Sequence, residues 1–212
     1  LTLTADGMNL TVTVETGAGV WWTFNLVKVP VSVLAGSWSL DGAGSAGVGP
    51  TPGNMDWWSA DAAAVEARAC WFDDSFVFGD DGSFSNVMGS ETWLETWQAD
   101  AEGCGAPVAP HDGSAAATYS YDEAAGTLTI NGKGAHLGLA KAVNGQELSD
   151  PGAAPDSITY QILTLTADGK NLTVTVETGA GVWWTFNLAK NDSVAPVDPV
   201  DPVDPVDPVD PV

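Results

Sequence analysis

Apolar and polar residues alternate with a period of two along much of this chain. Residues 1–4 and 10–14 alternate aliphatic side chains with threonine, and residues 20–26 form a third extended run. Such alternation predicts β-strands with one buried face. Turn-forming residues at 5–7 and 17–19 separate these runs, so the first 28 residues are predicted to form strands joined by tight turns.

The same pattern continues further along the chain, where a Gly-rich loop at 42–53 follows the first predicted strand. The predicted strands cover 36–40, 70–78, 83–88, 115–121, 126–131, 157–166, 171–177 and 181–189. Residues 59–69 are rich in alanine and predict a helix with Ser59 as its N-cap. Many short antiparallel strands with one short helix predict a mostly β protein, built as a small closed barrel.

Residues 1–28 occur a second time as residues 163–190, and only Met8/Lys170 and Val27/Ala189 differ. A period of 162 residues is about the size of one domain, which indicates tandem repetition of whole domains. We expect four segments. Residues 1–28 are the C-terminal strands of a preceding repeat, or strands donated to a neighbour. A joint (29–33), a complete barrel domain (34–190) and a linker (191–212) follow.

The predicted linker ends in five copies of Asp-Pro-Val, from Asp198 to Val212. Proline at every third residue favours the polyproline II conformation, which also has three residues per turn. The carboxylates then line up along one edge and repel one another. We therefore expect a stiff spacer.

Charge restricts the partners of this protein. Its 28 acidic residues face only six lysines and arginines, which gives a net charge of −22. No basic surface for nucleic acid can form from six scattered cations, and anionic membranes are disfavoured for the same reason. No apolar segment is long enough to insert into a membrane.

The two cysteines, Cys70 and Cys104, could be buried thiols, a disulfide or part of a metal site. Neither a CxxC spacing nor a histidine cluster accompanies them, so a zinc site is not indicated. A disulfide fits an extracellular protein best.

Four short motifs are Gly36-Ser37-Trp38, the hairpin from Phe78 to Phe84, Gly126-Thr127-Leu128-Thr129-Ile130, and the run from Trp184 to Lys190. Together they resemble the motifs of lipocalin-like domains in secreted and surface proteins of bacteria. Similar domains also look like appendages of secreted glycoside hydrolases. The resemblance covers most of residues 34–190 and implies a lipocalin-like barrel. It also implies that Lys190 packs across Trp38 as a cation–π lid that closes the barrel. The location that it implies is extracellular, at the bacterial cell surface.

Catalysis is not predicted. Glu91 and Glu95 lie beside tryptophans, but on one strand they would be about 13 Å apart, beyond the range of a glycosidase pair. His111 and His136 stand alone and are predicted to be surface or loop residues. No cofactor is expected. The acidic residues Asp73, Asp74, Asp80 and Asp81 could hold Ca²⁺, although turn formation fits their spacing better.

Ten tryptophans are the most conspicuous candidates for binding. A stacking platform for sugar rings could be formed by Trp57, Trp58, Trp71, Trp93 and Trp97. The same indoles could instead fill the barrel or an inter-domain contact. In the pair Trp183-Trp184, strand alternation predicts one indole inside the barrel and one outside.

Ser157 and Ser193 each follow an aspartate and precede an aliphatic residue, a pattern that resembles O-glycan acceptor sites of some Bacteroidota. A glycan there would shield the surface.

These observations favour a non-catalytic structural or adhesive module of an extracellular tandem-repeat protein. Its partners would be other copies of the same protein, joined into filaments through strand or barrel contacts. One alternative is a carbohydrate-binding module that uses exposed tryptophans to hold a polysaccharide. A second alternative is a lipocalin-like carrier of an apolar ligand.

Overall fold

The computed structural model describes residues 2–3, 9–27 and 32–191. The predicted linker beyond Asn191, and with it Ser193, lies outside the described residues. The chain divides into two compact units, with the boundary between Ala35 and Gly36.

The first unit is a three-stranded antiparallel sheet in the order β1-β2-β3. Its strands are β1 (Thr2–Leu3), β2 (Asn9–Gly17) and β3 (Val20–Val27). Strands β2 and β3 form a long hairpin in which Val14 pairs with Trp22 and Val12 with Phe24. The predicted strand positions agree with this hairpin, because alternation of valine and threonine favours extended backbone.

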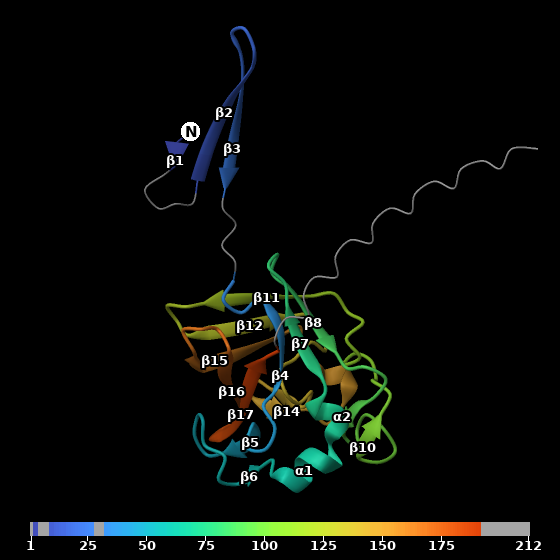
Figure 1. The fold of residues 1–212 in the computed structure, drawn as a ribbon. Helices are drawn as coiled ribbons and strands as arrows, with labels where there is room; N and C mark the ends of the chain where they lie inside the picture. Colours follow the sequence, from blue (N-terminus) through green and yellow to red (C-terminus); the bar gives the residue numbers. More distant parts are fainter. Residues whose placement is uncertain (1, 4–8, 28–31, 192–212) are drawn as a thin grey trace, which may run out of the picture. The chain divides into compact units, whose positions relative to one another are not determined.

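The second unit is a closed barrel of eight antiparallel strands, consistent with the lipocalin-like fold that the resemblance implies (Figure 1). The barrel strands are β4 (Gly36–Leu40), β7 (Ser75–Phe78), β8 (Ser83–Val87), β11 (Ala117–Asp122), β12 (Thr127–Asn131), β15 (Ser157–Leu165), β16 (Asn171–Gly179) and β17 (Val182–Lys190). Each strand pairs with the next in this order, and β17 returns to β4.

Strand β17 closes the barrel through two partners. Its C-terminal half pairs with β4, where Lys190 lies opposite Trp38. Its N-terminal half pairs with β5 (Ala46–Gly49), where Trp184 lies opposite Val48. The short strand β6 (Trp58–Ser59) extends this edge.

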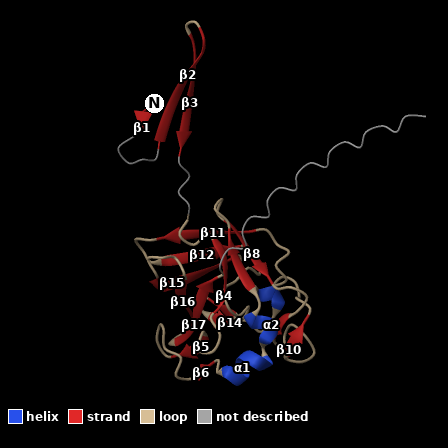
Figure 2. Cartoon of the chain, in the orientation of Figure 1, coloured by secondary structure: helices blue, strands red, loops and turns tan. Residues whose placement is uncertain are grey.

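Two short helices lie together at the end of the barrel that also holds β6 and β10 (Figures 1 and 2). They are α1 (Ala62–Ala67) and α2 (Ala69–Phe72). The predicted N-cap Ser59 is wrong, because Ser59 ends β6 and the Asp61 carboxylate instead accepts from the Ala64 amide at 2.8 Å. The strand expected over 70–78 begins only at Ser75, because the helical backbone continues to Phe72 and buries Cys70 and Trp71.

The remaining elements sit in the long connections between barrel strands. They are β9 (Thr92–Leu94), β10 (Gly103–Gly105), β13 (Ala142–Val143), β14 (Gln146–Glu147) and the 3₁₀ helix η1 (Pro151–Ala153). Strands β9 and β10 pair with each other, as do β13 and β14. Among the described residues, no helix is long and apolar enough to span a bilayer.

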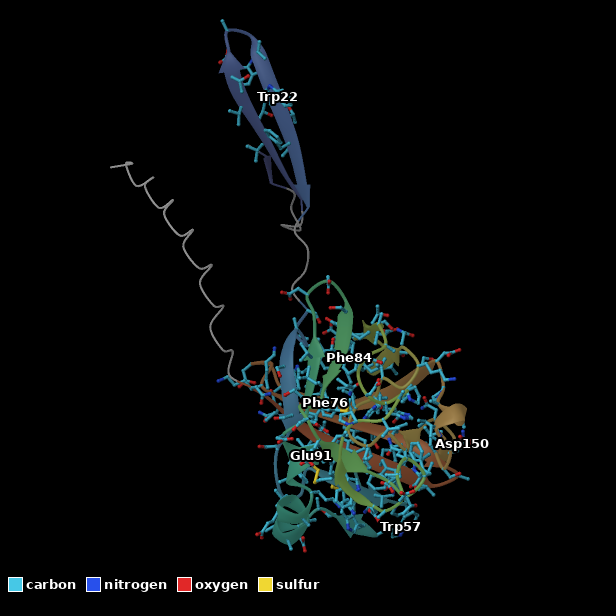
Figure 3. All side chains as sticks on the ribbon, turned by 90° about the vertical axis from the view of Figure 1, so that its right-hand side faces the viewer. Trp22, Trp57, Phe76, Phe84, Glu91 and Asp150 are labelled. Carbon is cyan, nitrogen blue, oxygen red and sulfur yellow. A yellow bond between two sulfur atoms is a disulfide. The ribbon has the colours of Figure 1, made fainter. Side chains whose placement is uncertain are left out.

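Large side chains fill the barrel interior. The largest fully buried ones include Trp38, Trp71, Tyr160, Phe76, Phe78, Phe186, Leu128 and Ile130. Phe76 and Phe84 lie among the densely packed side chains of the second unit in Figure 3. Burial of each such side chain stabilises the fold by roughly 1.5–3 kcal/mol, so the interior is a packed core.

Candidate functional site

The hairpin β16–β17 supplies a large part of the barrel core. Its inward side chains are all at most 5% exposed, namely Leu172, Val174, Val176, Trp184, Phe186 and Leu188. The ring of Phe186 lies so close to Gly138 that an added Cβ would come within 2.3 Å of it. Gly138 also has a φ of 68°, so glycine is required there on both counts.

Three side chains equivalent to this inward set are largely exposed in the first unit, namely Val14 at 46%, Trp22 at 59% and Phe24 at 47%. Trp22 is labelled on this hairpin in Figure 3. The rings of Trp22 and Phe24 stack at 6.5 Å, much as those of Trp184 and Phe186 do at 6.1 Å. The first hairpin therefore already has the conformation of a barrel-closing hairpin.

The pairing register of the two hairpins is also the same. Strands β2 and β3 shift register between Glu15 and Gly17, and β16 and β17 shift at the equivalent positions Glu177 and Gly179. The Glu15 side chain accepts from the Gly19 amide at 3.0 Å, and the corresponding bond at Glu177 is 3.1 Å.

The two substitutions between the repeats lie away from the core. Lys170 is exposed. On β17, Leu188 is buried in the core, so the next residue, Ala189, faces away from it and pairs with Ser39 of β4. Every core-facing residue is thus shared by both hairpins. We take the uncovered face of β2–β3, formed by Val14, Trp22 and Phe24, as the candidate interaction site and call it the hairpin face.

The predicted contact between Trp38 and Lys190 is present. The Lys190 Nζ lies 5.1 Å from the centroid of the fully buried Trp38 ring. Burial lowers the pKa of Lys190, while nearby Asp80 opposes this shift. Gly36 begins β4 with a φ of 127°, which side chains other than hydrogen rarely allow, and this explains the glycine there.

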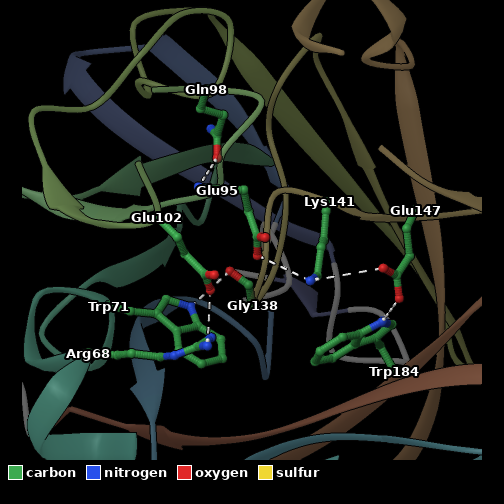
Figure 4. Close-up of polar contacts among 9 residues, drawn as sticks. All are labelled: Arg68, Trp71, Glu95, Gln98, Glu102, Gly138, Lys141, Glu147 and Trp184. Atoms are coloured by element: carbon green, nitrogen blue, oxygen red, sulfur yellow. Dashed lines mark hydrogen bonds and ion pairs between the residues drawn. The ribbon is translucent and has the colours of Figure 1, made fainter. Parts of the chain in front are cut away.

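The tryptophans predicted as a sugar platform do not form one surface. Arg68 lies between two of them, with its Cζ 5.4 Å from the Trp58 centroid and 4.2 Å from that of Trp93. Its guanidinium also pairs with Glu102 at 3.2 Å (Figure 4). The two indoles thus pack on a cation of the protein itself.

The other three members of that set are divided between core and surface. Trp71 is 2% exposed and its Nε1 donates to the Gly138 carbonyl at 3.2 Å, as Figure 4 shows. Trp97 packs edge-on against His111, with ring centroids 5.5 Å apart. Trp57 alone of the five is largely exposed, at 57%. Trp71 is therefore a core residue and cannot belong to a sugar platform.

Lys141 forms a second charged cluster that sequence reasoning missed. Its Nζ lies 3.2 Å from Glu95 and 3.9 Å from Glu147, and 5.3 Å from the Trp184 centroid (Figure 4). The Trp184 Nε1 donates to Glu147 at 2.6 Å. Glu95 is thus held by a lysine, while Glu91 is exposed on the surface. A single lysine separated from its partners in sequence gives no signal of this cluster.

Both histidines lie in loops, as one half of the prediction had it, but neither is on the surface. His111 is 4% and His136 6% exposed, and their ring centroids are 5.9 Å apart. Asn86 holds the backbone of His136 through its side-chain amide, donating to its carbonyl at 2.8 Å. Burial lowers the pKa of both histidines, that of His111 to about 4. The histidines are buried because their loops pass inward against β8.

Of the four acidic residues considered for Ca²⁺, Asp81 forms a turn and Asp74 is buried. Asp81 accepts from the amide and hydroxyl of Ser83 at 3.0 and 2.6 Å. Asp74 accepts from the Thr92 hydroxyl at 2.6 Å, and burial raises its pKa to about 7. Over the described part of the chain, no group of three or more potential metal ligands comes together.

The disulfide between Cys70 and Cys104 is confirmed. Its two Cα atoms are 5.9 Å apart, and it links helix α2 to strand β10. Ser157 is exposed at the start of β15, and its glycosylation stays a prediction.

An open groove of about 560 Å³ lies on the outer side of the barrel, and sequence reasoning did not anticipate it. It is lined mostly by small and polar residues, including Thr127, Asn144, Thr159, Gln161, Glu177 and the half-buried Trp183. Trp184 points inward and Trp183 lies beside this groove, as strand alternation predicts.

The groove exists because β15 and β16 separate at one end. Their pairing ends at Gln161 and Thr175. Beyond this point the Asn144 side chain takes the place of strand pairing on β15. It accepts a hydrogen bond from the Thr159 amide and donates one to the Thr159 carbonyl, each at 2.8 Å. The next amide, that of Gly145, donates to the Glu177 carbonyl at 2.8 Å.

No protein-family model matches the chain, and no curated protein matches it either.

Proposed function

We propose that this protein is a non-catalytic structural module that joins to others of its kind by barrel closure. The hairpin β2–β3 of one chain would complete a barrel whose own last two strands are missing or displaced. The observation that carries this proposal is the hairpin face, on which Trp22 and Phe24 are exposed although their equivalents Trp184 and Phe186 are core residues.

The open backbone edge supports the same conclusion. Strand β3 lies at the end of the described three-stranded sheet, whereas its equivalent β17 pairs with both β4 and β5. An apolar face next to an unpaired edge favours addition to another sheet. The matching partner is a barrel wall that offers edges like those of β15 and β4, which a second copy of this chain contains.

An extracellular location at the bacterial surface remains part of this proposal. The disulfide between Cys70 and Cys104 is the supporting observation, because disulfides persist in oxidising compartments. The excess of acidic residues would keep assembled copies in solution through mutual repulsion.

The test is to compare Trp22→Asp with Trp21→Asp in the full chain. Both variants introduce a carboxylate into β3 at residues of equal exposure, 59% each. Only Trp22 corresponds to a core position, so Trp22→Asp should abolish assembly while Trp21→Asp should leave it largely unchanged. Light scattering coupled to size-exclusion chromatography, with electron microscopy of concentrated samples, measures assembly.

Equal assembly of the two variants would rule out closure through the hairpin face. A wild-type chain that stays monomeric at every concentration would overturn the whole proposal. The melting temperature of the barrel should be the same in all three proteins, which controls for misfolding.

Carbohydrate binding is a second candidate, and the outer groove favours it. Hydroxyl and amide side chains along the groove, together with Trp183, offer the mixture of polar contacts and an aromatic face that sugars require. We expect Trp183→Ala to weaken retention on an immobilised polysaccharide at least tenfold, with Trp57→Ala as the matched control. Equal retention of both variants would exclude the groove. The carrier alternative has less support, because large side chains occupy the barrel interior.

A further inference from the structure

We propose that the chain's own hairpin β2–β3 can replace β16–β17 and close the same barrel. The exchange would release β16–β17 with its apolar face free to enter a second copy. This inference rests on the proposed function, because both use the hairpin face, and it adds a mechanism by which a closed chain becomes competent to assemble.

The two hairpins fit the same position between β15 and β4. All of their core-facing residues are the same, and both keep the same register and the same shift near the turn. Phe24 would therefore take the place of Phe186 against Gly138, and Trp22 the place of Trp184. Neither position that differs between the repeats faces the core.

The connection between β3 and β4 is long enough for the exchange. In the barrel, Lys190 lies opposite Trp38, so its sequence equivalent at position 28 would lie opposite Trp38 after exchange. Residues 29–35 would then form the connecting loop, because β4 begins at Gly36. Seven residues can span roughly 23 Å, far more than the approximately 5 Å between paired Cα atoms.

The direction of the chain also permits it. Strand β17 runs antiparallel to β4. Strand β3 directly precedes β4 in the sequence, so it would also be antiparallel to β4 if a short loop let the two strands pair. The result is a circular permutation of the barrel, in which the order of strands around the wall is unchanged. Domain termini that lie close together make such permutations tolerable.

The two closed states should be close in stability. They bury the same side chains, and the loops that tether the hairpins are similar in length. After exchange the loop before β4 has seven residues, 29–35, whereas five residues, 166–170, now join β15 to β16. Loop entropy of this kind changes the ratio of the two states by about twofold at most.

A set of variants in the full chain tests the exchange, namely Phe186→Asp, Phe24→Asp and both together. A carboxylate at 186 buries an unpaired charge in the present barrel, so β16–β17 should leave and β2–β3 should take its place. We expect Phe186→Asp to stay folded and monomeric, with near-UV circular dichroism and a cooperative melt like those of the wild type. Phe24→Asp should change neither signal, and the double variant should lose both.

Limited proteolysis gives an independent readout of the same exchange. Trypsin should cut Phe186→Asp rapidly at Lys190, because the released hairpin is accessible, and should leave the remaining barrel intact. Cleavage at Lys190 should be slow in the wild type, where this residue is paired with Trp38 of β4.

The outcomes separate this inference from the proposed function. If Phe186→Asp is as unfolded as the double variant, β2–β3 cannot close its own barrel and the inference is wrong. If Phe186→Asp folds only as a dimer or larger species, closure occurs between copies, which overturns exchange within one chain and supports the proposed function.

Discussion

At the scale of single residues, burial gives several titratable groups unusual properties. His111 and His136 are held neutral inside the second unit, and burial lowers the pKa of both. Asp74 behaves in the opposite sense, since burial raises its pKa to about 7 and favours the protonated carboxyl. Between pH 4 and 7 the histidines and Asp74 therefore change the stability of the fold in opposite directions.

Replacement of His111 by phenylalanine separates the effect of this histidine on stability from that of Asp74. The pKa of His111 is 6.5 in the unfolded chain and about 4 in the folded protein, so the unfolded chain takes up the proton first as the pH falls. The stability that neutral His111 contributes is present above pH 6.5 and is lost between pH 6.5 and 4. We expect His111→Phe to abolish this loss, which is at most roughly 3 kcal/mol.

Urea denaturation at a series of pH values measures this effect. Asp74→Asn is the matched control, because it removes the effect of opposite sign, which is present below pH 3.8 and is lost as the pH rises through 7. An unchanged pH dependence in His111→Phe would show that the pKa of His111 is the same in the folded and the unfolded protein.

Sequence patterns predicted some residues of the site but not others. The contact between Trp38 and Lys190 was predictable only through the resemblance to lipocalin-like domains, and the disulfide because few alternatives exist for two cysteines. The burial of His111 and His136 could not be predicted, since it results from inward loops whose course depends on contacts far away in sequence, such as that of Asn86 with His136.

At the scale of elements, strands were predicted better than the connections between them. Period-two alternation is local, so β8, β12, β16 and β17 lie close to their predicted ranges. The separation of β15 from β16 depends instead on a side chain from a third segment, Asn144, that takes the place of strand pairing. No periodicity in the sequence records such an insertion.

The disulfide acts at this scale, because it ties α2 to β10 across 34 residues of chain. Closing a loop of this length stabilises a domain by roughly 3–4 kcal/mol. We expect Cys70→Ser/Cys104→Ser to lower the melting temperature by roughly 6–16 °C, as measured by calorimetry. The barrel strands should remain, so the far-UV circular dichroism at 20 °C should be unchanged. A variant that melts like the wild type would show that the segment is held by packing alone.

At the scale of the whole molecule, two nearly identical hairpins accompany a single barrel. One hairpin closes the barrel, and the other has the same conformation with its apolar face uncovered. A chain of this kind holds more closing elements than it needs for one barrel. The surplus hairpin is the basis for both the assembly and the exchange proposed above.

The seam between β4 and β17 has a mechanical consequence. The barrel begins at Gly36 and ends at Lys190 on these neighbouring antiparallel strands, and the Asn191 amide still donates to the Ser37 carbonyl at 2.8 Å. Tension applied through the two ends would therefore pull the strands apart from one end, breaking hydrogen bonds one after another rather than together in shear. The seam would yield at low force. Under the exchange proposed above, the second hairpin would then fill the gap, and an assembly under tension would lengthen before it ruptured.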